Sequence, residues 1–168
     1  MDITQDGFLG GRLQLSQPKT GYRAGIDPVL LAAACPAKPG EKVLELGCGV
    51  GVASMCLMAR VPEVRLHGVE ILSEYAQIAR DNAAQNNFEF EVQVGDVSAR
   101  PTPFNGHEFH QIIMNPPYFE ANSSSISPDA GRASGRAEVV ALSHWVDTAA
   151  KRLRPRGYLT LIQRVERL

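Results

Sequence analysis

The stretch "LELGCGVG", residues 44 to 51, decides the fold class of this 168-residue chain. It ends the apolar strand-like run "KVLELG" (42 to 47), and Gly47, Gly49 and Gly51 separate that run from the helix-like "VASMCLMARV" (52 to 61). Glycines let a backbone turn tightly and approach a ligand, and a following helix N-terminus offers unpaired N–H groups. The pattern predicts a strand, a turn that binds a nucleotide-like cofactor, and a helix.

The spacing of these glycines counts against a dinucleotide cofactor. The dinucleotide fingerprint is G-x-G-x-x-G, whereas this chain has G-x-G-x-G, with Val52 at the position of the third glycine of the fingerprint. Two acids then follow at strand ends. Glu70 ends "EVRLHGVEI" (63 to 71), where a carboxylate can accept both hydroxyls of a ribose, and Asp96 ends "FEFEVQVGD" (88 to 96), where we expect it to meet an adenine amino group.

The rest of the chain continues the alternation of strands and helices, which predicts one α/β domain with a parallel sheet. We expect Asp27 and Ser73 to be helix N-caps. A short strand or hairpin is expected near "RLQLSQ" (12 to 17). The other expected helices are 27–35, 73–87 and 138–153, and the other expected strands are 109–114 and 157–163.

Composition excludes several classes of function. The formal net charge is −1, so any binding of nucleic acid must rest on a local patch, for which the candidate is the basic cluster at residues 151 to 156. That cluster also fits the cations expected at a helix C-terminus. No apolar run approaches the roughly 18 residues that cross a bilayer, and we expect a cytoplasmic protein without a membrane partner. The three cysteines and four histidines lack metal-ligand spacing, and we predict no metal.

The run "FHQIIM" (109 to 114) is followed directly by "NPPY", residues 115 to 118. Asn-Pro and Pro-Pro are turn formers, because proline fixes φ and pushes the preceding residue out of the helical region. A simple turn is therefore one interpretation of this motif. The glycine turn and the acids upstream favour a second interpretation, in which the motif carries chemistry.

Taken together, these motifs resemble the class I S-adenosylmethionine-dependent methyltransferases. The "NPPY" motif resembles the branch that methylates exocyclic amines of bases or the side-chain amide of glutamine. The resemblance implies a Rossmann-like fold with a mostly parallel twisted sheet and helices on both faces. It also implies S-adenosyl-L-methionine as cofactor and S-adenosyl-L-homocysteine as product, with these cofactor-binding residues: Glu45, Gly47, Gly49, Gly51, Glu70, Asp96 and Asn115.

The same resemblance assigns catalytic roles to Asn115, Pro116, Pro117 and Tyr118. The Asn115 side-chain oxygen and the Pro116 carbonyl would accept hydrogen bonds from the two N–H groups of the substrate amine. The prolines would hold that carbonyl rigidly, which favours a productive attack geometry. Tyr118 would stack on an extruded base, worth roughly 1–3 kcal/mol, and Phe119 would widen the platform.

The segment "QPKTGYRAGIDPVLLAA" (17 to 33) resembles YfiC-like tRNA(Val) adenine-N6 methyltransferases, in which it folds over the cofactor pocket. The resemblance implies N6 of adenine in tRNA as the acceptor, and makes Lys19, Arg23 and Asp27 candidates for closing the site or touching substrate. Arg132 and Arg136, with the basic cluster, would contact phosphates.

Three alternatives remain open. The chain could methylate glutamine of a protein, as in release-factor modification, or guanine N2 in rRNA, since both acceptors are compatible with Asn115. A scaffold that binds cofactor and RNA without catalysis is the third alternative, and the intact "NPPY" argues against it.

The class I fold usually ends with a sixth and a seventh strand, whereas this chain stops just after its fifth. We therefore expect one domain, 1–168, that lacks these strands. Residues 1–27 would be an N-terminal segment over the cofactor pocket and residues 28–168 the Rossmann-like core. The open edge of strand five would be explained by a fragment, which we favour, or by a partner that covers it.

Overall fold

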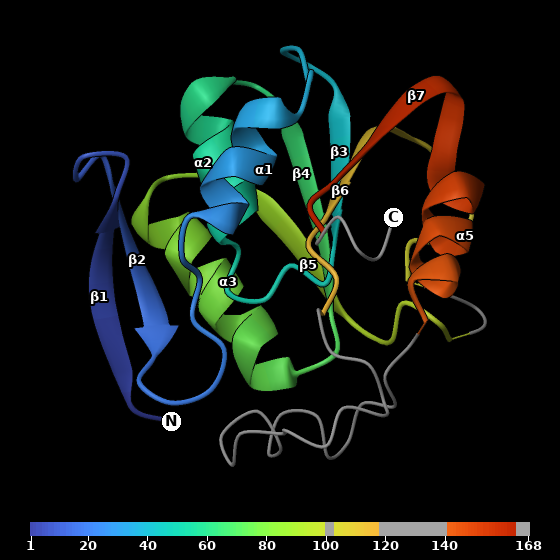
Figure 1. Ribbon diagram of the computed structural model, residues 1–168. Coiled ribbons are helices and arrows are strands. Elements are labelled where there is room, and N and C mark those ends of the chain that lie inside the picture. The colour runs from blue at the N-terminus through green and yellow to red at the C-terminus, as the bar shows by residue number, and fades with distance from the viewer. Residues whose placement is uncertain (100–102, 118–140, 164–168) are drawn as a thin grey trace.

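The computed structural model describes residues 1–99, 103–117 and 141–163 of the chain. Its centre is a sheet of parallel strands in the order β5-β4-β3-β6-β7 (Figure 1). This order and direction confirm the expected Rossmann-like α/β fold. The strands are β3 (Lys42–Leu46), β4 (Arg65–Glu70), β5 (Phe90–Val94), β6 (Phe109–Met114) and β7 (Leu153–Leu161).

Helices cover both faces of the sheet, as expected (Figure 1). Side chains of a strand point alternately to its two faces. On β3, Val43 belongs to the core cluster that contains the three helices α1 to α3, while Leu44 belongs to the cluster with Trp145 of α5. The helices are α1 (Asp27–Ala34), α2 (Val52–Arg60), α3 (Ser73–Gln85) and α5 (Leu142–Arg152).

An antiparallel hairpin, β1 (Ile3–Phe8) and β2 (Leu13–Pro18), lies outside the sheet beside α3 (Figure 1). Its second strand confirms the hairpin expected near "RLQLSQ". Leu13 and Leu15 point into the same core cluster as α2 and α3, which explains the alternation of apolar and polar residues there. The hairpin therefore extends the layer of helices on one face of the sheet.

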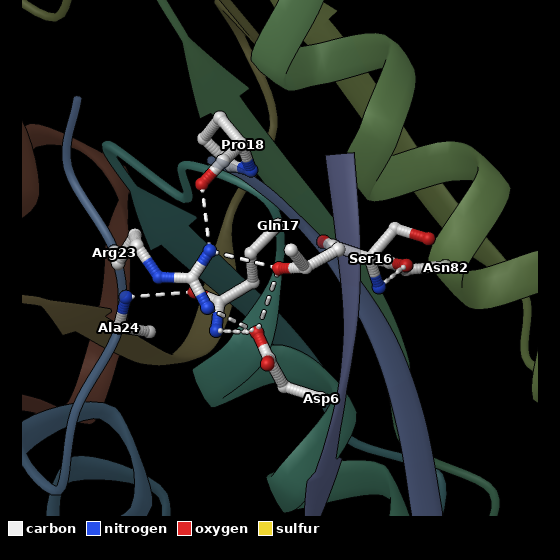
Figure 2. Close-up of polar contacts among 8 residues, drawn as sticks. Asp6, Ser16, Gln17, Pro18, Arg23, Ala24 and Asn82 are labelled. Atoms are coloured by element: carbon white, nitrogen blue, oxygen red, sulfur yellow. Dashed lines mark hydrogen bonds and ion pairs between the residues drawn. The ribbon is translucent and has the colours of Figure 1, made fainter. Parts of the chain in front are cut away.

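A fully buried amide fastens this hairpin to the rest of the molecule. Asn82 of α3 is 0% exposed, and its Oδ1 accepts the Ser16 N–H at 2.7 Å. Its Nδ2 donates to the carbonyl of Ser16 at 3.0 Å and to the carbonyl of Val50 at 2.9 Å. Figure 2 shows Asn82 facing Ser16. One side chain thus joins the hairpin, α3 and the loop that precedes α2.

Both predicted N-caps are wrong by one residue. Helix α1 begins at Asp27 and has Ile26 as its N-cap, and helix α3 begins at Ser73 and has Leu72 as its N-cap. Neither cap residue accepts through its side chain. Ile26 already has nearly helical backbone angles (φ −81°, ψ −25°), so Asp27 lies in the first turn, where a carboxylate still interacts favourably with the helix dipole.

Strand β7 begins at Leu153, four residues before the predicted start at 157. Its pairing with β6 is irregular, since Leu153 pairs with Phe109 and Tyr158 with Gln111. Arg156 lies in this irregular stretch with a φ of +65°. The extra residues form the amino-terminal end of β7, next to the beginning of β6.

This register places the basic cluster at the amino-terminal edge of the sheet. Arg154 and Arg156 are exposed there, at the opposite end of the sheet from Asn115. The expected phosphate contact is wrong for Arg152, which is 9% exposed and donates to the Asn105 amide oxygen at 3.2 Å. Burial lowers the pKa of its guanidinium.

The three cysteines are buried and unbridged, as their apolar neighbourhoods predicted. Within residues 1–99, 103–117 and 141–163, the structure contains no cluster of three or more His, Cys, Asp or Glu side chains that could hold a metal ion. None of the helices in these ranges is both long and apolar enough to cross a membrane.

We expect Asn82→Ala to lower the free energy of unfolding by about 2–4 kcal/mol, because it leaves buried backbone groups of Ser16 and Val50 without a partner. Asn86→Ala is the matched control. Asn86 bonds the N–H and carbonyl of Gln14 in the same way but at a more exposed position, and its loss should cost about 1 kcal/mol or less. Urea unfolding measures both, and equal losses would contradict the role of burial.

Candidate functional site

The candidate site lies at the carboxyl ends of β3 and β6, which are neighbours in the middle of the sheet. Leu46 pairs with Met114, so the glycine loop that follows β3 and the Asn-Pro-Pro segment that follows β6 leave the sheet side by side. The chain continues from β3 toward β4 and β5 on one side, and from β6 toward β7 on the other. Open α/β sheets bind ligands at such a change of direction.

The three glycines of the loop have positive φ angles but different surroundings. A Cβ on Gly47 (φ +66°) would lie 2.7 Å from the Trp145 ring, and one on Gly51 (φ +86°) would lie 3.1 Å from the Phe90 ring. A Cβ on Gly49 (φ +54°) would meet no atom of the described residues within 4 Å. Two glycines therefore permit close packing, and the middle one faces open space.

Glu70, at the end of β4, holds this loop. Its carboxylate accepts the Gly49 N–H at 2.8 Å and the Leu72 N–H at 2.9 Å, and the residue is only 7% exposed. Burial raises the pKa of the carboxyl group, while the backbone N–H groups oppose that rise. The Cys48 N–H adds a bond to the carbonyl of Val69 at 2.9 Å. The loop is thus fixed to β4 by both backbone and side chain.

Glu45 lies behind the loop. Its carboxyl group accepts the backbone N–H of Ser54 at 3.1 Å and the Ser54 hydroxyl at 2.6 Å, and so supports the first turn of α2. Burial raises the pKa of Glu45 to about 8, with a smaller contribution from the charge of Glu70. Through these contacts Glu45 supports the loop. Direct contact of Glu45 with a cofactor stays a prediction.

Asp96 follows β5, where the sequence placed it. One of its carboxylate oxygens accepts the N–H and the hydroxyl of Ser98, both at 2.7 Å. The preceding residue, Gly95, donates its N–H to the Glu70 carbonyl at 2.9 Å. The acids at the ends of β4 and β5 therefore lie on neighbouring strands at the same edge of the sheet.

The residues after β6 form the other wall. Asn115 is half-buried, Pro116 is buried and Pro117 is exposed. The carbonyl of Met114 accepts the Ile162 N–H at 3.2 Å, which keeps the ends of β6 and β7 together. Asn115 donates through Nδ2 to the hydroxyl of Tyr22 at 3.3 Å. Tyr22 was missed by the sequence analysis, although it lies within the 17–33 segment assigned to the pocket.

The charged candidates of that segment have structural partners. Arg23 donates to Thr4 and to the carbonyl of Pro18, each at 2.8 Å, and pairs with Asp6 at 2.7 Å. Figure 2 shows the contacts of this guanidinium with hairpin residues. Lys19 forms an exposed ion pair with Asp2 at 3.5 Å. A role in substrate binding stays a prediction for Arg23. Four further predicted residues, Tyr118, Phe119, Arg132 and Arg136, lie outside the described residues.

The donors and acceptors of the site fit a nucleoside cofactor. An ionised carboxylate accepts at about four lone-pair positions, and Glu70 uses two of them for backbone N–H groups, so acceptor capacity remains for two ribose hydroxyls. Gly49 lies next to this carboxylate, and a side chain on it would project into open space. Both features are those expected of a loop that a ligand approaches closely.

Two grooves lie at the other edge of the sheet. One, of about 1050 Å³, lies among the ends of α2, β4 and β5, and includes Arg65, His67 and Phe88. The other, of about 740 Å³, includes His107 and Arg154. Neither contains a predicted catalytic or cofactor-binding residue, and the second includes Arg154 of the basic cluster.

Comparison with known proteins identifies related chains. The methyltransferase small domain family matches residues 25–166. A protein of Porphyromonas gingivalis named tRNA1(Val) (adenine(37)-N6)-methyltransferase is 33% identical over 172 residues, covering 97% of this chain and 67% of its own length. A protein of Yersinia enterocolitica with the same name is 35% identical over 115 residues, covering 67% and 46%. The chain thus spans between about half and two thirds of these relatives.

A solved structure supports the fold. The T. Thermophilus 16S rRNA N2 G1207 methyltransferase, in complex with AdoMet and guanosine, superimposes with a TM-score of 0.64. The match covers 95% of this chain and 41% of that chain at 23% identity.

We expect Gly47→Ala to destabilise the protein more than Gly49→Ala. Each substitution forces alanine into a positive φ, which costs about 1–2 kcal/mol. Only Gly47→Ala adds a clash with the Trp145 ring, which adds about 1–3 kcal/mol. Thermal unfolding of both variants measures the difference. In a Trp145→Leu background, Gly47→Ala should cost no more stability than Gly49→Ala does. Equal losses of stability in the two single glycine variants would contradict the packing of Gly47 against Trp145.

Proposed function

The chain belongs to the methyltransferase small domain family, and on that premise we propose that it is an S-adenosylmethionine-dependent methyltransferase acting on N6 of an adenine in tRNA. The observation that carries the proposal is the match with proteins named as tRNA1(Val) (adenine(37)-N6)-methyltransferases, one of which aligns with 97% of this chain. The side-by-side exit of the glycine loop and the Asn115 segment supports it. A tRNA substrate also implies a cytoplasmic location.

The cofactor would bind along the ends of β3, β4 and β5. Gly49 would let it approach the loop, Glu70 would accept the ribose hydroxyls, and Asp96 would accept from the adenine amino group. When bound, S-adenosylmethionine supplies an electrophilic methyl group on a sulfonium. Gly47 and Gly51 would serve the site indirectly, because they allow the loop to pack on Trp145 and Phe90.

Asn115 and Pro116 would orient the acceptor amine. The lone pair of an exocyclic amine on a purine is delocalised into the ring, so the nitrogen is a poor nucleophile. Hydrogen bonds from its two N–H groups to the Asn115 side-chain oxygen and the Pro116 carbonyl would favour a tetrahedral nitrogen with a directed lone pair. The contribution of the protein is then mainly orientation, and Pro116 and Pro117 restrict the backbone that provides it.

Residues outside the described ranges complete the proposal. Tyr118 and Phe119 would stack on the extruded base, and Arg132 and Arg136 would contact phosphates. The exposed Arg154 and Arg156 lie at the far edge of the sheet, so they would contact a part of the RNA remote from the modified base.

The experiment follows a labelled methyl group from S-adenosylmethionine into bacterial tRNA, rRNA and protein, offered separately to the chain. We expect label in tRNA, released by ribonuclease as N6-methyladenine. Label in rRNA as N2-methylguanine, or label in protein that survives ribonuclease and is released by protease, would replace the acceptor we propose. The absence of label from all three fractions would contradict the enzymatic proposal for this chain.

Asn115→Ala tests the role of the amide in the same assay. We expect the rate of methyl transfer to fall by roughly 100-fold or more, as for other groups that orient a reacting atom. Because the amide acts on the incoming amine, the Kd for S-adenosylhomocysteine, measured by calorimetry, should stay within about tenfold of the unsubstituted protein. Parallel losses of transfer and cofactor affinity would instead make Asn115 a residue that forms the cofactor pocket.

A further inference from the structure

Tyr22 lies in the segment Pro18–Asp27, which connects the hairpin to α1, and this segment is fastened before and after the tyrosine. Arg23 binds the carbonyl of Pro18 and the carboxylate of Asp6, while the N–H of Ala24 donates to the Gln17 side chain at 2.8 Å (Figure 2). Since the hairpin is itself held by Asn82, the backbone around Tyr22 has a fixed position.

A second tyrosine fixes the same backbone from α3. Tyr75 is 6% exposed, and its hydroxyl oxygen packs against the backbone at Gly21, the residue before Tyr22. This oxygen lies 2.7 Å from the position that a Cβ on Gly21 would take, and Gly21 has a φ of +98°. A glycine is required there by both space and conformation. Tyr22 is therefore presented by a closely fitted turn.

The side chain of Tyr22 does not pack in the hydrophobic core. The residue is 53% exposed, yet its hydroxyl lies 3.3 Å from Nδ2 of Asn115. Removal of the hydroxyl end from water, with smaller contributions from the charges of Asp27 and Glu45, raises the pKa of Tyr22. The group is thus a neutral phenol at physiological pH, and its oxygen accepts the N–H of Asn115.

The two ends of the Asn115 amide are chemically different, and Nδ2 is the end that the Tyr22 hydroxyl binds in this structure. When Nδ2 faces Tyr22, the carbonyl end Oδ1 faces away from it. A substrate amine presents N–H donors and needs an acceptor. The amide rotated by 180° would present its own N–H groups to those donors, so the orientation seen here is the one suited to an amine acceptor.

We propose that Tyr22 is a positioning residue for methyl transfer, whose hydroxyl accepts from Nδ2 and so holds the Asn115 side chain in place while Oδ1 receives the substrate amine. This inference rests on the proposed function. The hairpin, α3 and the Pro18–Asp27 segment then have a shared role at the site, because together they deliver one phenol to the amide at the end of β6.

Tyr22→Phe tests the inference, because it removes the hydroxyl and keeps the ring. We expect kcat for methyl transfer to tRNA to fall by roughly tenfold, the size of one lost hydrogen bond. The KM for tRNA and the Kd for S-adenosylhomocysteine should change by about twofold or less, since neither depends on the amide orientation. Tyr158→Phe, at an exposed tyrosine of β7, is the matched control and should leave all three values unchanged.

The side-chain amide of Asn115 gives a readout that needs no catalysis. Its ¹⁵N–¹H₂ signals, assigned with Asn115→Asp, should shift in Tyr22→Phe and stay in place in Tyr158→Phe. Unchanged Asn115 signals in Tyr22→Phe would overturn the inference. An unchanged kcat in Tyr22→Phe would also overturn the inference. The same holds if cofactor affinity and Tm fall while kcat is preserved, because Tyr22 would then only stabilise the Pro18–Asp27 segment.

The two proposals fail in different ways. A wild-type protein that transfers no methyl group would overturn the proposed function and, with it, the role of Tyr22 in transfer. A wild-type protein that is active, with an equally active Tyr22→Phe variant, would overturn the role of Tyr22 alone.

Discussion

The geometry of the site depends on the buried amide of Asn82. It lies where three buried backbone groups of two segments need a polar partner, and it bonds the N–H and carbonyl of Ser16 together with the carbonyl of Val50. Since Val50 belongs to the glycine loop and Ser16 to the hairpin, the same side chain fixes the loop and the base of the segment that carries Tyr22. An apolar residue of similar size would leave buried backbone groups without hydrogen bonds.

Buried polar groups make the carboxyl ends of the parallel strands rigid. Glu45 and Glu70 both have raised pKa values because of burial, and both use their oxygens to hold backbone N–H groups of the loop and of the helix after it. Burial of a carboxyl group is unfavourable unless hydrogen bonds compensate it. The two carboxyl groups hold the loop in one conformation. In that conformation a Cβ on Gly49 would project into open space.

Much of this arrangement was predictable from the sequence, because it follows from local pattern. The strands at 42–47 and 109–114, the glycine turn, and the acids at the strand ends are set by apolar alternation, glycine spacing and the βα order. The contacts that complete the site join residues far apart in the chain. Nothing in the sequence around Tyr22 indicates that its hydroxyl reaches Asn115, and nothing around Arg23 indicates its ion pair with Asp6. The N-caps lie one residue before the predicted ones, at Ile26 and Leu72, whose apolar side chains cannot accept a hydrogen bond and so give no cap signal in the sequence.

In the proposed function the cofactor binds at the carboxyl ends of β3, β4 and β5, and not in the grooves at the opposite ends of the strands. Titration of the ¹⁵N-labelled protein with S-adenosylhomocysteine tests it most directly, because each backbone amide reports on its own position. We expect shifts at Gly49, Leu72 and Ser98, whose N–H groups are bonded to the acids at the strand ends. Shifts confined to residues of the opposite grooves, such as Phe88 and His107, or no shifts at a saturating concentration, would contradict it.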